Sequence, residues 1–489
     1  MLITMFYNFQ TRYTDLHKSM YQLLELPKLT SPQIILLNSQ LLNELQLSNT
    51  SEISVDDLLG FTSNTTPFAQ AYAGHQFGHF TMLGDGRAMI LGEHIFKDKD
   101  NQLQRFDIQL KGSGPTQYSR GNDGKATAKS MLREYLFSYA MKQLGIDTSQ
   151  SLAILRTGEK VQRFNTEKGA ILIRVMKSHI RFGTFEFASK YLEQEDFKEF
   201  TKYVILGHYP HLLLENQELD SNVYLNFFKA VMQKCITMVV NWYRAGFIHG
   251  VMNTDNMSIV GETFDYGPCS FMNQYKKDTV FSKIDKFGRY SFENQKPILQ
   301  WNLSVFAQSL VYLFEKDEEG VEEFVSDLNR LIEEFDIVFD KQFYEMMMGK
   351  LGIDTKQYSI EDVKSLIDEM LDFLEETCTD YTNFFIELMY PNSFEDEIFS
   401  SEKFSNLKTE LQKIGLNVEI MKHYNPQRIL RNYLVEEALE EYESTEKLDK
   451  IQELLDVVSS PYEEDERFKK YQLPPSKEFE KRYTTHCNT

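Results

Sequence analysis

Apolar residues recur with one spacing in the first part of the chain and with another spacing in the second part. Up to about residue 195, short stretches alternate apolar and polar residues, which is the two-residue period of β-strands. From about residue 196, apolar residues recur every three or four positions over longer stretches, which is the period of amphipathic helices. The pattern therefore predicts an α+β protein whose first part is rich in strands and whose second part is helical.

The clearest predicted strand is RFDIQLK at residues 105–111. Its alternation turns Phe106, Ile108 and Leu110 to one face and leaves Lys111 on the other, where a flexible GSGP turn begins. Several phosphotransferases use a strand-borne lysine to hold a nucleotide phosphate. A solvated lysine is the alternative, and Lys111 considered alone favours that alternative.

A helix is predicted over residues 126–143, where apolar residues keep helical spacing. Glu134 lies at the edge of its apolar face. It can reach back to Lys111 and orient the lysine, or it can face solvent, and the pattern supports both interpretations equally.

A second strand, ILIRV at residues 171–175, carries Arg174 on the same side as apolar residues. A charge in such a strand is costly unless it is paired. Together with Arg181, this arginine suits the phosphate tail of a nucleotide. A structural salt bridge is the second interpretation.

Two glycine-rich turns lie in the same part of the chain. Gly84 and Gly86 flank an aspartate and precede Arg87, and GNDG follows at residues 121–124. Glycine lets backbone N–H groups approach phosphate oxygens closely, and an arginine donates in a planar fork. Ordinary β-turns are the alternative for both segments.

Two further segments have patterns of their own. Leucine and isoleucine at helical spacing predict a helix over residues 34–47. In PFAQAYAGHQFGHF, His75 and His79 lie four residues apart, a spacing that suits a metal ion on a helix. Because Gly74 and Gly78 disfavour a regular helix there, we expect structural histidines instead.

The helix predicted over residues 224–244 leads into FIHGVMNTDNM and then into DYG. Asp255, Asn256 and Asp265 thus follow apolar runs and lie on two polar turns that are close in sequence. Oxygen ligands from neighbouring loops suit a hard cation such as Mg²⁺, which keeps several waters and also binds substrate phosphates.

Composition and charge narrow the possible functions. The chain has 489 residues and a net charge of −21, and the acidic excess lies after residue 190. The basic residues concentrate within residues 105–181, which suggests a compact anion such as a nucleoside triphosphate rather than a nucleic acid. Four widely spaced cysteines without a CxxC motif fit a reducing cytoplasm. We find neither a signal-peptide pattern nor an uncharged apolar run as long as a membrane span.

Several blocks of the chain resemble the selenoprotein O family. The matching blocks are PFAQAYAGHQFGHF, LGDGRA, IQLKGSGPTQYSRGNDGKA, LREYL, LRTGE, IRVMKSHIRFGTFEF, FIHGVMNTDNMSI and DYGPC, which occur in this order between Pro67 and Cys269. Such long, ordered blocks are more specific than any single glycine pattern. The resemblance implies a protein adenylyltransferase with a protein-kinase-like, bilobal pseudokinase fold.

This fold implies four regions in a chain of this length. We expect residues 1–60 to form an N-terminal extension on the kinase-like core and residues 61–195 to form a β-rich lobe that binds nucleotide phosphates. Residues 196–315 would form a helical lobe with the catalytic and metal loops. Residues 316–489 would form a helical C-terminal extension and a polar tail.

The resemblance also implies roles for individual residues. Lys111 and Glu134 would be the kinase-type lysine and its helix partner, and Asp255 would be the catalytic base. Asn256 and Asp265 would bind the metal, Mg²⁺ or Mn²⁺, and ATP would be the substrate. The implied nucleotide contacts are Gly84, Gly86, Arg87, Lys111, Asp123, Gly124, Glu134, Arg174, Arg181 and Asp265.

One departure from ordinary kinases points to different chemistry. The kinase catalytic loop runs H-R-D-L-x-x-x-N, but His249 is followed by Gly250 and Val251, so an apolar residue occupies the aspartate position. The resemblance implies a reversed nucleotide whose α-phosphorus accepts a Ser, Thr or Tyr hydroxyl of a protein, with loss of pyrophosphate. The alternatives are a γ-phosphoryl protein kinase with a displaced base and a non-catalytic, ATP-binding pseudokinase scaffold.

The remaining expectations concern partners and redox state. We expect a monomer that binds ATP and protein substrates with hydroxyl side chains, and that binds neither nucleic acid nor membrane. Members of the family often carry cysteine or selenocysteine near the C-terminus, which suggests a Cys269–Cys487 bridge across the site. Two unrelated, reduced thiols are the interpretation that a cytoplasmic protein favours.

Overall fold

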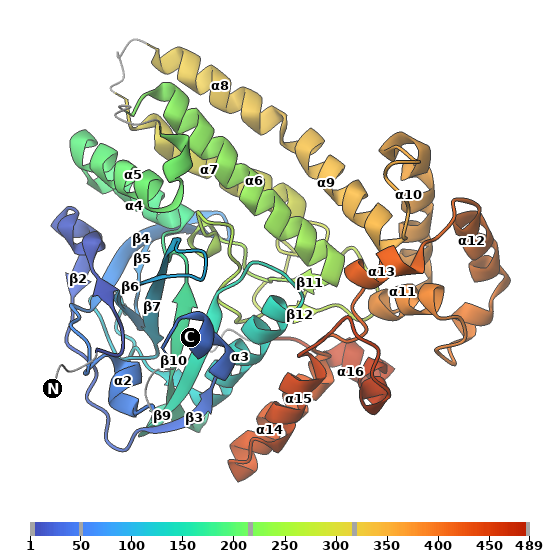
Figure 1. Cartoon of the computed structure of the whole chain (residues 1–489), viewed down its shortest axis with the longest axis horizontal. Coiled ribbons are helices and arrows are strands. Elements are labelled where there is room, and N and C mark those ends of the chain that lie inside the picture. Colours follow the sequence, from blue (N-terminus) through green and yellow to red (C-terminus); the bar gives the residue numbers. More distant parts are fainter. Residues whose placement is uncertain (1–4, 48–51, 214–218, 315–319, 486–489) are drawn as a thin grey trace.

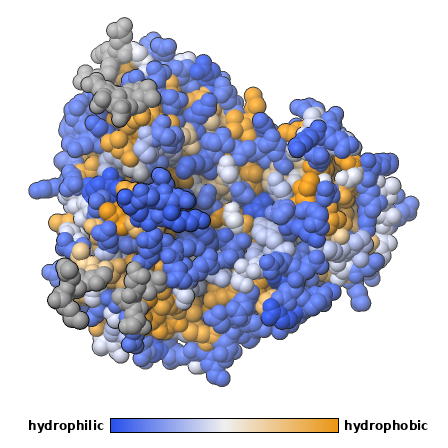
Figure 2. Space-filling model, viewed as in Figure 1, coloured by the Kyte–Doolittle hydropathy of each residue, from blue (hydrophilic) through white to orange (hydrophobic). Residues whose placement is uncertain are grey.

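The computed structural model describes residues 5–47, 52–213, 219–314 and 320–485. The first part of the chain builds one large sheet, and the second part is almost entirely helical (Figure 1). The α+β class and the division into a β-rich and a helical region are therefore confirmed, and this division is compatible with two lobes. The face shown in Figure 2 is mostly hydrophilic, with hydrophobic residues in scattered areas.

The sheet is antiparallel, and its strands come from all of the first 176 residues. Its order is β2 (Tyr21–Leu23), β4 (Phe68–Gln76), β6 (Ala88–Lys97), β7 (Leu103–Lys111), β10 (Thr166–Met176), β9 (Gln150–Gln162) and β3 (Gln33–Leu37). Three short strands join it at the sides: β1 (Phe9–Gln10) pairs with β6, β5 (His79–Gly84) with β4, and β8 (Ala126–Thr127) with β10.

The register of β7 and β10 places two cations on one face of the sheet. Leu172 lies opposite Lys111, and Arg174 lies opposite Gln109. Directly opposed residues of antiparallel strands point to the same side, so Lys111 and Arg174 are diagonal neighbours on this face. Ile108 points to the other face, where it is fully buried, as the alternation predicted.

Each face of the sheet has its own apolar cover. Helix α3 (Ala128–Gln143) begins at the N-cap Thr127 and packs on β9 and β10, on the face that carries Lys111. Leucines of α1 (Ser39–Glu44) and α2 (Val55–Leu59) pack on the opposite face, against β6, β7, β9 and β10. Helix α3 is thus held close to the two cations, as the site requires.

Residues 34–47 correct one expectation, because they form a strand and a short helix rather than one helix. The strand β3 forms the edge of the sheet and pairs along β9, from Gln33 opposite Arg156 to Leu37 opposite Ala153. This pairing satisfies its backbone groups through residues more than a hundred positions away, which outweighs a local helical spacing. Asn38 then accepts a hydrogen bond from the N–H of Leu41 and starts α1.

The segment with two histidines forms the hairpin β4–β5. His75 Nδ1 lies 2.5 Å from Glu186 Oε2 of α4 (Phe182–Tyr191), and the His75 ring packs edge-on against Trp301. His79 is exposed in the strand that follows the turn. The structure thus gives His75 the structural contacts that we expected.

The helical region follows β10 and contains the helices predicted from residue 224 onward. A short hairpin of β11 (Phe247–Ile248) and β12 (Ser270–Phe271) interrupts it. The described helices are α4, α5 (Gln194–His208), α6 (Ser221–Ala245), α7 (Gln295–Val311), α8 (Val321–Glu333), α9 (Phe335–Lys350), α10 (Ile360–Thr377), α11 (Tyr381–Met389), α12 (Glu402–Lys413), α13 (Val418–Tyr424), α14 (Asn432–Thr445), α15 (Asp449–Val457) and α16 (Lys477–Arg482).

Helix α6 has the length and apolar composition of a membrane span, and within the described residues no other helix does. Most of its most apolar window, 61%, is buried inside the protein, as in a core helix. Helices α14 and α15 return from the helical region to pack on α3, so the last part of the chain lies beside the sheet (Figure 1).

Candidate active site

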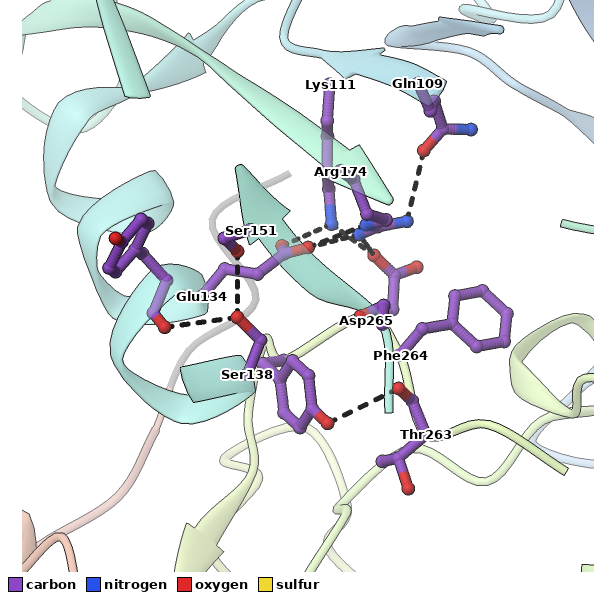
Figure 3. Close-up of polar contacts among 12 residues, drawn as sticks. Gln109, Lys111, Glu134, Ser138, Ser151, Arg174, Thr263, Phe264 and Asp265 are labelled. Carbon is purple, nitrogen blue, oxygen red and sulfur yellow. Dashed lines mark hydrogen bonds and ion pairs between the residues drawn. The ribbon is translucent and has the colours of Figure 1, made fainter. Parts of the chain in front are cut away.

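Four charged side chains, of which Asp265 is partly exposed and the other three are buried, form one network between the sheet, α3 and the DYG turn (Figure 3). The Nζ of Lys111 donates to Glu134 Oε2 at 2.6 Å and also to Asp265 Oδ1. The Nε of Arg174 donates to Glu134 Oε1 at 2.9 Å, and its Nη2 donates to Asp265 Oδ1 at 2.7 Å. Two cations and two carboxylates therefore hold one another in place, and the predicted contact between Lys111 and Glu134 is present.

The network sets the charge of its members. Burial raises the pKa of Glu134, but Arg174 and Lys111 outweigh burial and lower it overall. The same balance of burial against Lys111 and Arg174 leaves the pKa of Asp265 well below its ordinary value. Burial and the neighbouring Arg174 lower the pKa of Lys111. Both carboxylates are thus ionised at neutral pH, where they can orient the lysine and hold a cation.

Asp265 reaches the network through an unusual backbone conformation. Its φ is +67°, a left-handed value that aspartate tolerates better than most residues. The preceding carbonyl, of Phe264, bonds the ring of His249 at 3.0 Å, and the hydroxyl of the following Tyr266 bonds Thr148. These contacts tie the turn to the β11–β12 hairpin and fix the direction of the Asp265 carboxylate.

Asp255 and Asn256 lie on the 3₁₀ turn Thr254–Asn256. The Nη1 of Arg181 donates to the carbonyl of Asp255 at 3.0 Å, and the hydroxyl of Thr254 accepts from the N–H of His75 at 2.8 Å. The amide nitrogen of Asn256 donates to the carbonyl of Val251 at 2.9 Å. The turn is therefore anchored both to the sheet and to its own loop.

The carboxylate of Asp255 is buried and incompletely bonded. Its Oδ1 has no hydrogen-bond partner among the described residues, and Gln76 Nε2 lies 3.5 Å from its Oδ2. Burial raises its pKa to about 6, although the cationic Arg181 opposes this shift. A general base is most effective when its pKa lies near the working pH, so Asp255 has the properties of a proton acceptor.

Gly74 of β4 has no side chain, and this leaves room for the carboxylate of Asp255. A Cβ atom at Gly74 would lie 2.3 Å from Asp255 Oδ1. A Cβ atom at Gly183, at the start of α4, would lie 1.9 Å from the carbonyl of Ala73. The strand β4, the helix α4 and the turn Thr254–Asn256 therefore meet closely, and only glycine fits at these two positions.

These side chains surround a cavity of about 960 Å³. Six of the residues predicted for the site line it: Arg87, Lys111, Glu134, Asp255, Asn256 and Asp265. These six residues, which span 178 positions of the sequence, thus line one cavity, as the order of the sequence blocks suggested.

The other predicted residues lie outside the lining of this cavity. Arg174 has the ion pairs that the second interpretation expected, and Arg181 lies 3.8 Å from Asp85 and stacks 4.1 Å from the ring centre of Tyr72. Their contact with a nucleotide stays a prediction.

The glycine-rich turns are packed against protein. Cβ atoms at Gly84 and Gly86 would meet the ring and the carbonyl of Tyr118, at 2.3 and 2.8 Å. Asp123 pairs with Arg163 at 2.9 Å, and a Cβ atom at Gly124 would meet the carbonyl of Gly114. The two turns thus shape the rim of the sheet, and a phosphate contact for them stays a prediction.

Four further cations line the cavity: Arg120, Lys129, Arg133 and Arg482. The sequence patterns did not indicate them as site residues. Lys129 and Arg133 lie four residues apart on α3, a spacing that could have indicated a shared basic face. Arg482 belongs to α16, near the end of the chain, and nothing in its local pattern links it to the site. Arg133 also binds the carbonyls of Gly267 and Cys269, at 3.2 and 2.7 Å.

The donor set fits a divalent cation that prefers oxygen. Asn256 uses its nitrogen for Val251, which leaves its oxygen as a donor, and Asp265 uses only Oδ1 for its two ion pairs. The described residues contain no group of three His, Cys, Asp or Glu that could hold a metal. One or two protein oxygens completed by waters and substrate phosphates are the usual set for Mg²⁺, so these two residues would hold it.

The cysteine hypothesis is not tested. Cys487 lies outside the described residues, so the Cys269–Cys487 bridge stays a prediction; Cys269 itself is buried.

A cavity that the described residues line with six cations and five carboxylates, a buried lysine held by two of those carboxylates and a nearby carboxylate of raised pKa are features of an enzyme-type site. Comparison with known proteins gives the family. A family model described as protein adenylyltransferase SelO matches residues 3–459. The chain belongs to this SelO family, and it is accordingly an enzyme of the nucleotidyltransferase class.

Relatives in several bacteria match over nearly their whole length, each with the name protein nucleotidyltransferase YdiU. The Clostridium perfringens protein (strain SM101) is 43% identical over 473 residues, which cover 94% of this chain and 93% of the relative. The Brevibacillus brevis protein is 41% identical over 496 residues, covering 99% and 98%. The Nitrosococcus oceani protein is 40% identical over 498 residues, covering 99% and 97%.

Proposed function

We propose that this enzyme transfers AMP from ATP to Ser, Thr or Tyr hydroxyls of proteins and releases pyrophosphate, with Mg²⁺ or Mn²⁺ as the metal. The observation that carries the proposal is the position of Asp255. Its buried carboxylate, with a pKa of about 6, lines the same cavity as Lys111 and Asp265 and is next in sequence to Asn256. The names of the family and of the relatives support a nucleotidyl transfer to protein.

A kinase-like core is part of the proposal. Protein kinases pair a strand lysine with a helix glutamate, and a DFG aspartate binds the metal. Lys111, Glu134 and the Asp265 of DYG have the corresponding contacts and elements. The β-rich and helical regions would then be the two lobes, and residues of both lobes would line the cavity.

Val251 argues against γ-phosphoryl transfer by the usual kinase arrangement. It stands where the kinase catalytic loop has its aspartate, and it is apolar and 7% exposed. The carboxylate of this loop is instead four residues further on, at Asp255. A base at position 255 rather than 251 suits attack on the α-phosphorus rather than the γ-phosphorus. This observation favours AMP transfer over the kinase alternative.

The residues divide the work as follows. Asp255 accepts the proton of the acceptor hydroxyl as its oxygen bonds to the α-phosphorus, and the bond from that phosphorus to the β-phosphate oxygen breaks. Lys111, Arg87 and the other cavity cations stabilise the charge that leaves with pyrophosphate. Asn256 and Asp265 would hold the metal, which when bound neutralises phosphate charge. Glu134 and Arg174 position Lys111 and Asp265.

Isotope position tests the proposal. The protein is incubated with bacterial lysate and Mg²⁺, and with ATP labelled at either the α- or the γ-phosphorus. Protein-bound label from the α position alone is expected. Label from the γ position alone would replace the proposal with a kinase, and absence of both labels, with ATP still bound, would replace it with a scaffold.

Asp265→Asn is the matched inactive control. We expect it to abolish transfer while the fold persists, because asparagine tolerates the left-handed φ that Asp265 adopts. Asp265→Ala would add backbone strain at this position and is the less informative variant. Unchanged transfer by Asp265→Asn would remove this residue from the proposed metal site. A cytoplasmic location and a monomeric state are part of the proposal and need separate measurement.

A further inference from the structure

A second hollow of about 740 Å³ opens beside the active-site cavity. Phe77 and Ile284 line both spaces, so the groove continues from the wall that carries Asp255. The rest of its lining comes from residues 285–301, which include the loop before α7 and the first turns of α7, and from His79 on the β4–β5 hairpin. A protein acceptor must bring its hydroxyl to Asp255, and this groove is a surface along which the flanking residues can lie.

The groove exposes apolar side chains. Phe287 is 98% exposed and Ile284 is 57% exposed, and Trp301 and Pro297 lie in the same lining. A phenylalanine held almost entirely in water contributes nothing to folding, and grouped exposed apolar residues mark interaction sites. These residues are therefore available to bind an apolar side chain of a partner.

The groove is also cationic, within the acidic part of the chain. Arg289 and Lys286 line it, and neither makes an ion pair with a carboxylate among the described residues. The carboxylate of the acidic neighbour, Asp285, accepts hydrogen bonds from the backbone N–H groups of Arg289 and Tyr290, at 2.9 and 2.7 Å. Two cations thus face this single, buried carboxylate, and the net positive charge of the groove complements an acidic segment.

Two aromatic rings position Arg289 in the groove, where it can bind such a ligand. Its guanidinium carbon lies 4.9 Å from the ring centre of Trp301 and 5.7 Å from that of Tyr290. Its Nε is buried and has no hydrogen-bond partner among the described residues. A buried donor without a partner costs free energy, and a carboxylate of a bound segment would satisfy it.

The groove is linked to the catalytic turn. Asn253 Oδ1 accepts hydrogen bonds from the hydroxyl of Tyr290 at 2.5 Å and from the N–H of Phe77 at 3.2 Å. Asn253 is two residues before Asp255, so both sides of the groove are fixed relative to the proposed base.

From this geometry we infer that the groove binds the acceptor-bearing segment of the protein substrate. It selects a segment with an acidic residue, held by Arg289 and Lys286, and an apolar residue, held by Phe287 and Trp301, near the acceptor hydroxyl. The inference rests on the proposed function and adds the substrate class to it.

A peptide library tests this selection. Peptides with one Ser, Thr or Tyr acceptor and varied flanking residues are incubated with the enzyme, Mg²⁺ and α-labelled ATP. The wild type is expected to prefer acidic and apolar flanking residues. Arg289→Glu is expected to reverse the charge preference towards basic peptides, and Phe287→Ser to raise the KM for the best peptide about tenfold through loss of one apolar contact.

The controls separate this inference from the proposed function. Lys276→Glu makes the same charge change on an exposed lysine of the same loop that is outside the groove lining, and it should keep the acidic preference. The Kd for ATP, measured by calorimetry, should be unchanged in all three variants, because none of the three residues lines the nucleotide cavity.

Three results would overturn the inference. They are a wild type without charge preference, an Arg289→Glu variant with unchanged preference, and lysate proteins that are labelled while the whole library is not. A concentration-dependent dimer that Phe287→Ser dissociates, seen by sedimentation, would assign the groove to a second copy of the chain instead. Loss of α-label from lysate proteins would be a failure of the proposed function itself.

Discussion

The substitution Asp255→Asn should abolish transfer and at the same time stabilise the protein. The carboxylate is buried beside Gly74, and its Oδ1 is without a partner among the described residues. Its pKa is raised from 3.8 to about 6, so the folded protein binds a proton that the unfolded chain releases at lower pH. Its ionised form therefore destabilises the fold, and this cost appears as the pH rises from about 4 to 6.

The size of the effect follows from the shift. Two pKa units at about 1.4 kcal/mol each give a cost of about 3 kcal/mol at pH 7.5 and less than about 1 kcal/mol at pH 4. Asparagine has nearly the same shape and no charge. The difference in free energy of unfolding between the variant and the wild type should thus favour the variant by about 2 kcal/mol more at pH 7.5 than at pH 4.

Urea unfolding at both pH values, followed by circular dichroism, measures this difference. The variant should show no transfer of label from α-labelled ATP, and the wild-type kcat/KM should rise with pH with a midpoint near 6. A difference in unfolding free energy that is the same at both pH values would contradict the raised pKa. Wild-type levels of transfer by Asp255→Asn would contradict its role as base.

The remaining predictions concern three other positions. Gly74→Ala should lower transfer at least about tenfold, because its Cβ atom displaces the Asp255 carboxylate. Gly207→Ala is the matched control, because its Cβ atom would meet only the end of the Arg12 side chain, at an ordinary contact distance of 3.6 Å, and equal activity of the two variants would contradict the argument. Glu134→Gln should lower the free energy of unfolding by about 3–5 kcal/mol, because two buried cations lose their shared carboxylate; a loss below about 1 kcal/mol in urea unfolding would refute this. Lys350→Met should stabilise the protein most at low pH, because burial leaves the pKa of Lys350 well below its ordinary value, and part of this gain is offset by loss of the hydrogen bond of 2.9 Å that Lys350 Nζ donates to the carbonyl of Arg244. Since the stability of the wild type then rises with pH, the advantage of the variant should shrink as the pH rises, and an advantage independent of pH would count against it.

The periodic parts of the fold were predictable from the sequence. The alternation of residues 105–111 and the helical spacing of residues 126–143 agree with β7 and α3, because both patterns are regular along the whole element, although both elements are buried on more than one side. Residues 34–47 were predicted wrongly, because the strand there depends on pairing with β9, which no local pattern contains. The same holds for the contact of His75 with Glu186, which is on another element.

The site was predictable to the extent that its residues lie in motifs. Lys111, Glu134, Asp255, Asn256 and Asp265 meet in one cavity, as their types and the family resemblance implied. The approach of α16 to this cavity and the groove at Phe287 were not predictable. Both arise from packing between segments that are distant in the sequence, and single exposed or basic residues carry no local signal of such packing.

The central claim is that the α-phosphorus of ATP is transferred, and the leaving group tests it most directly. Pyrophosphate and ADP are both quantified while modified acceptor protein accumulates, and the modified residue is identified by mass spectrometry. We predict one pyrophosphate released per acceptor, no ADP, and an adenylyl group on a hydroxyl side chain. One ADP per acceptor and a phosphoryl group on that side chain would contradict the account.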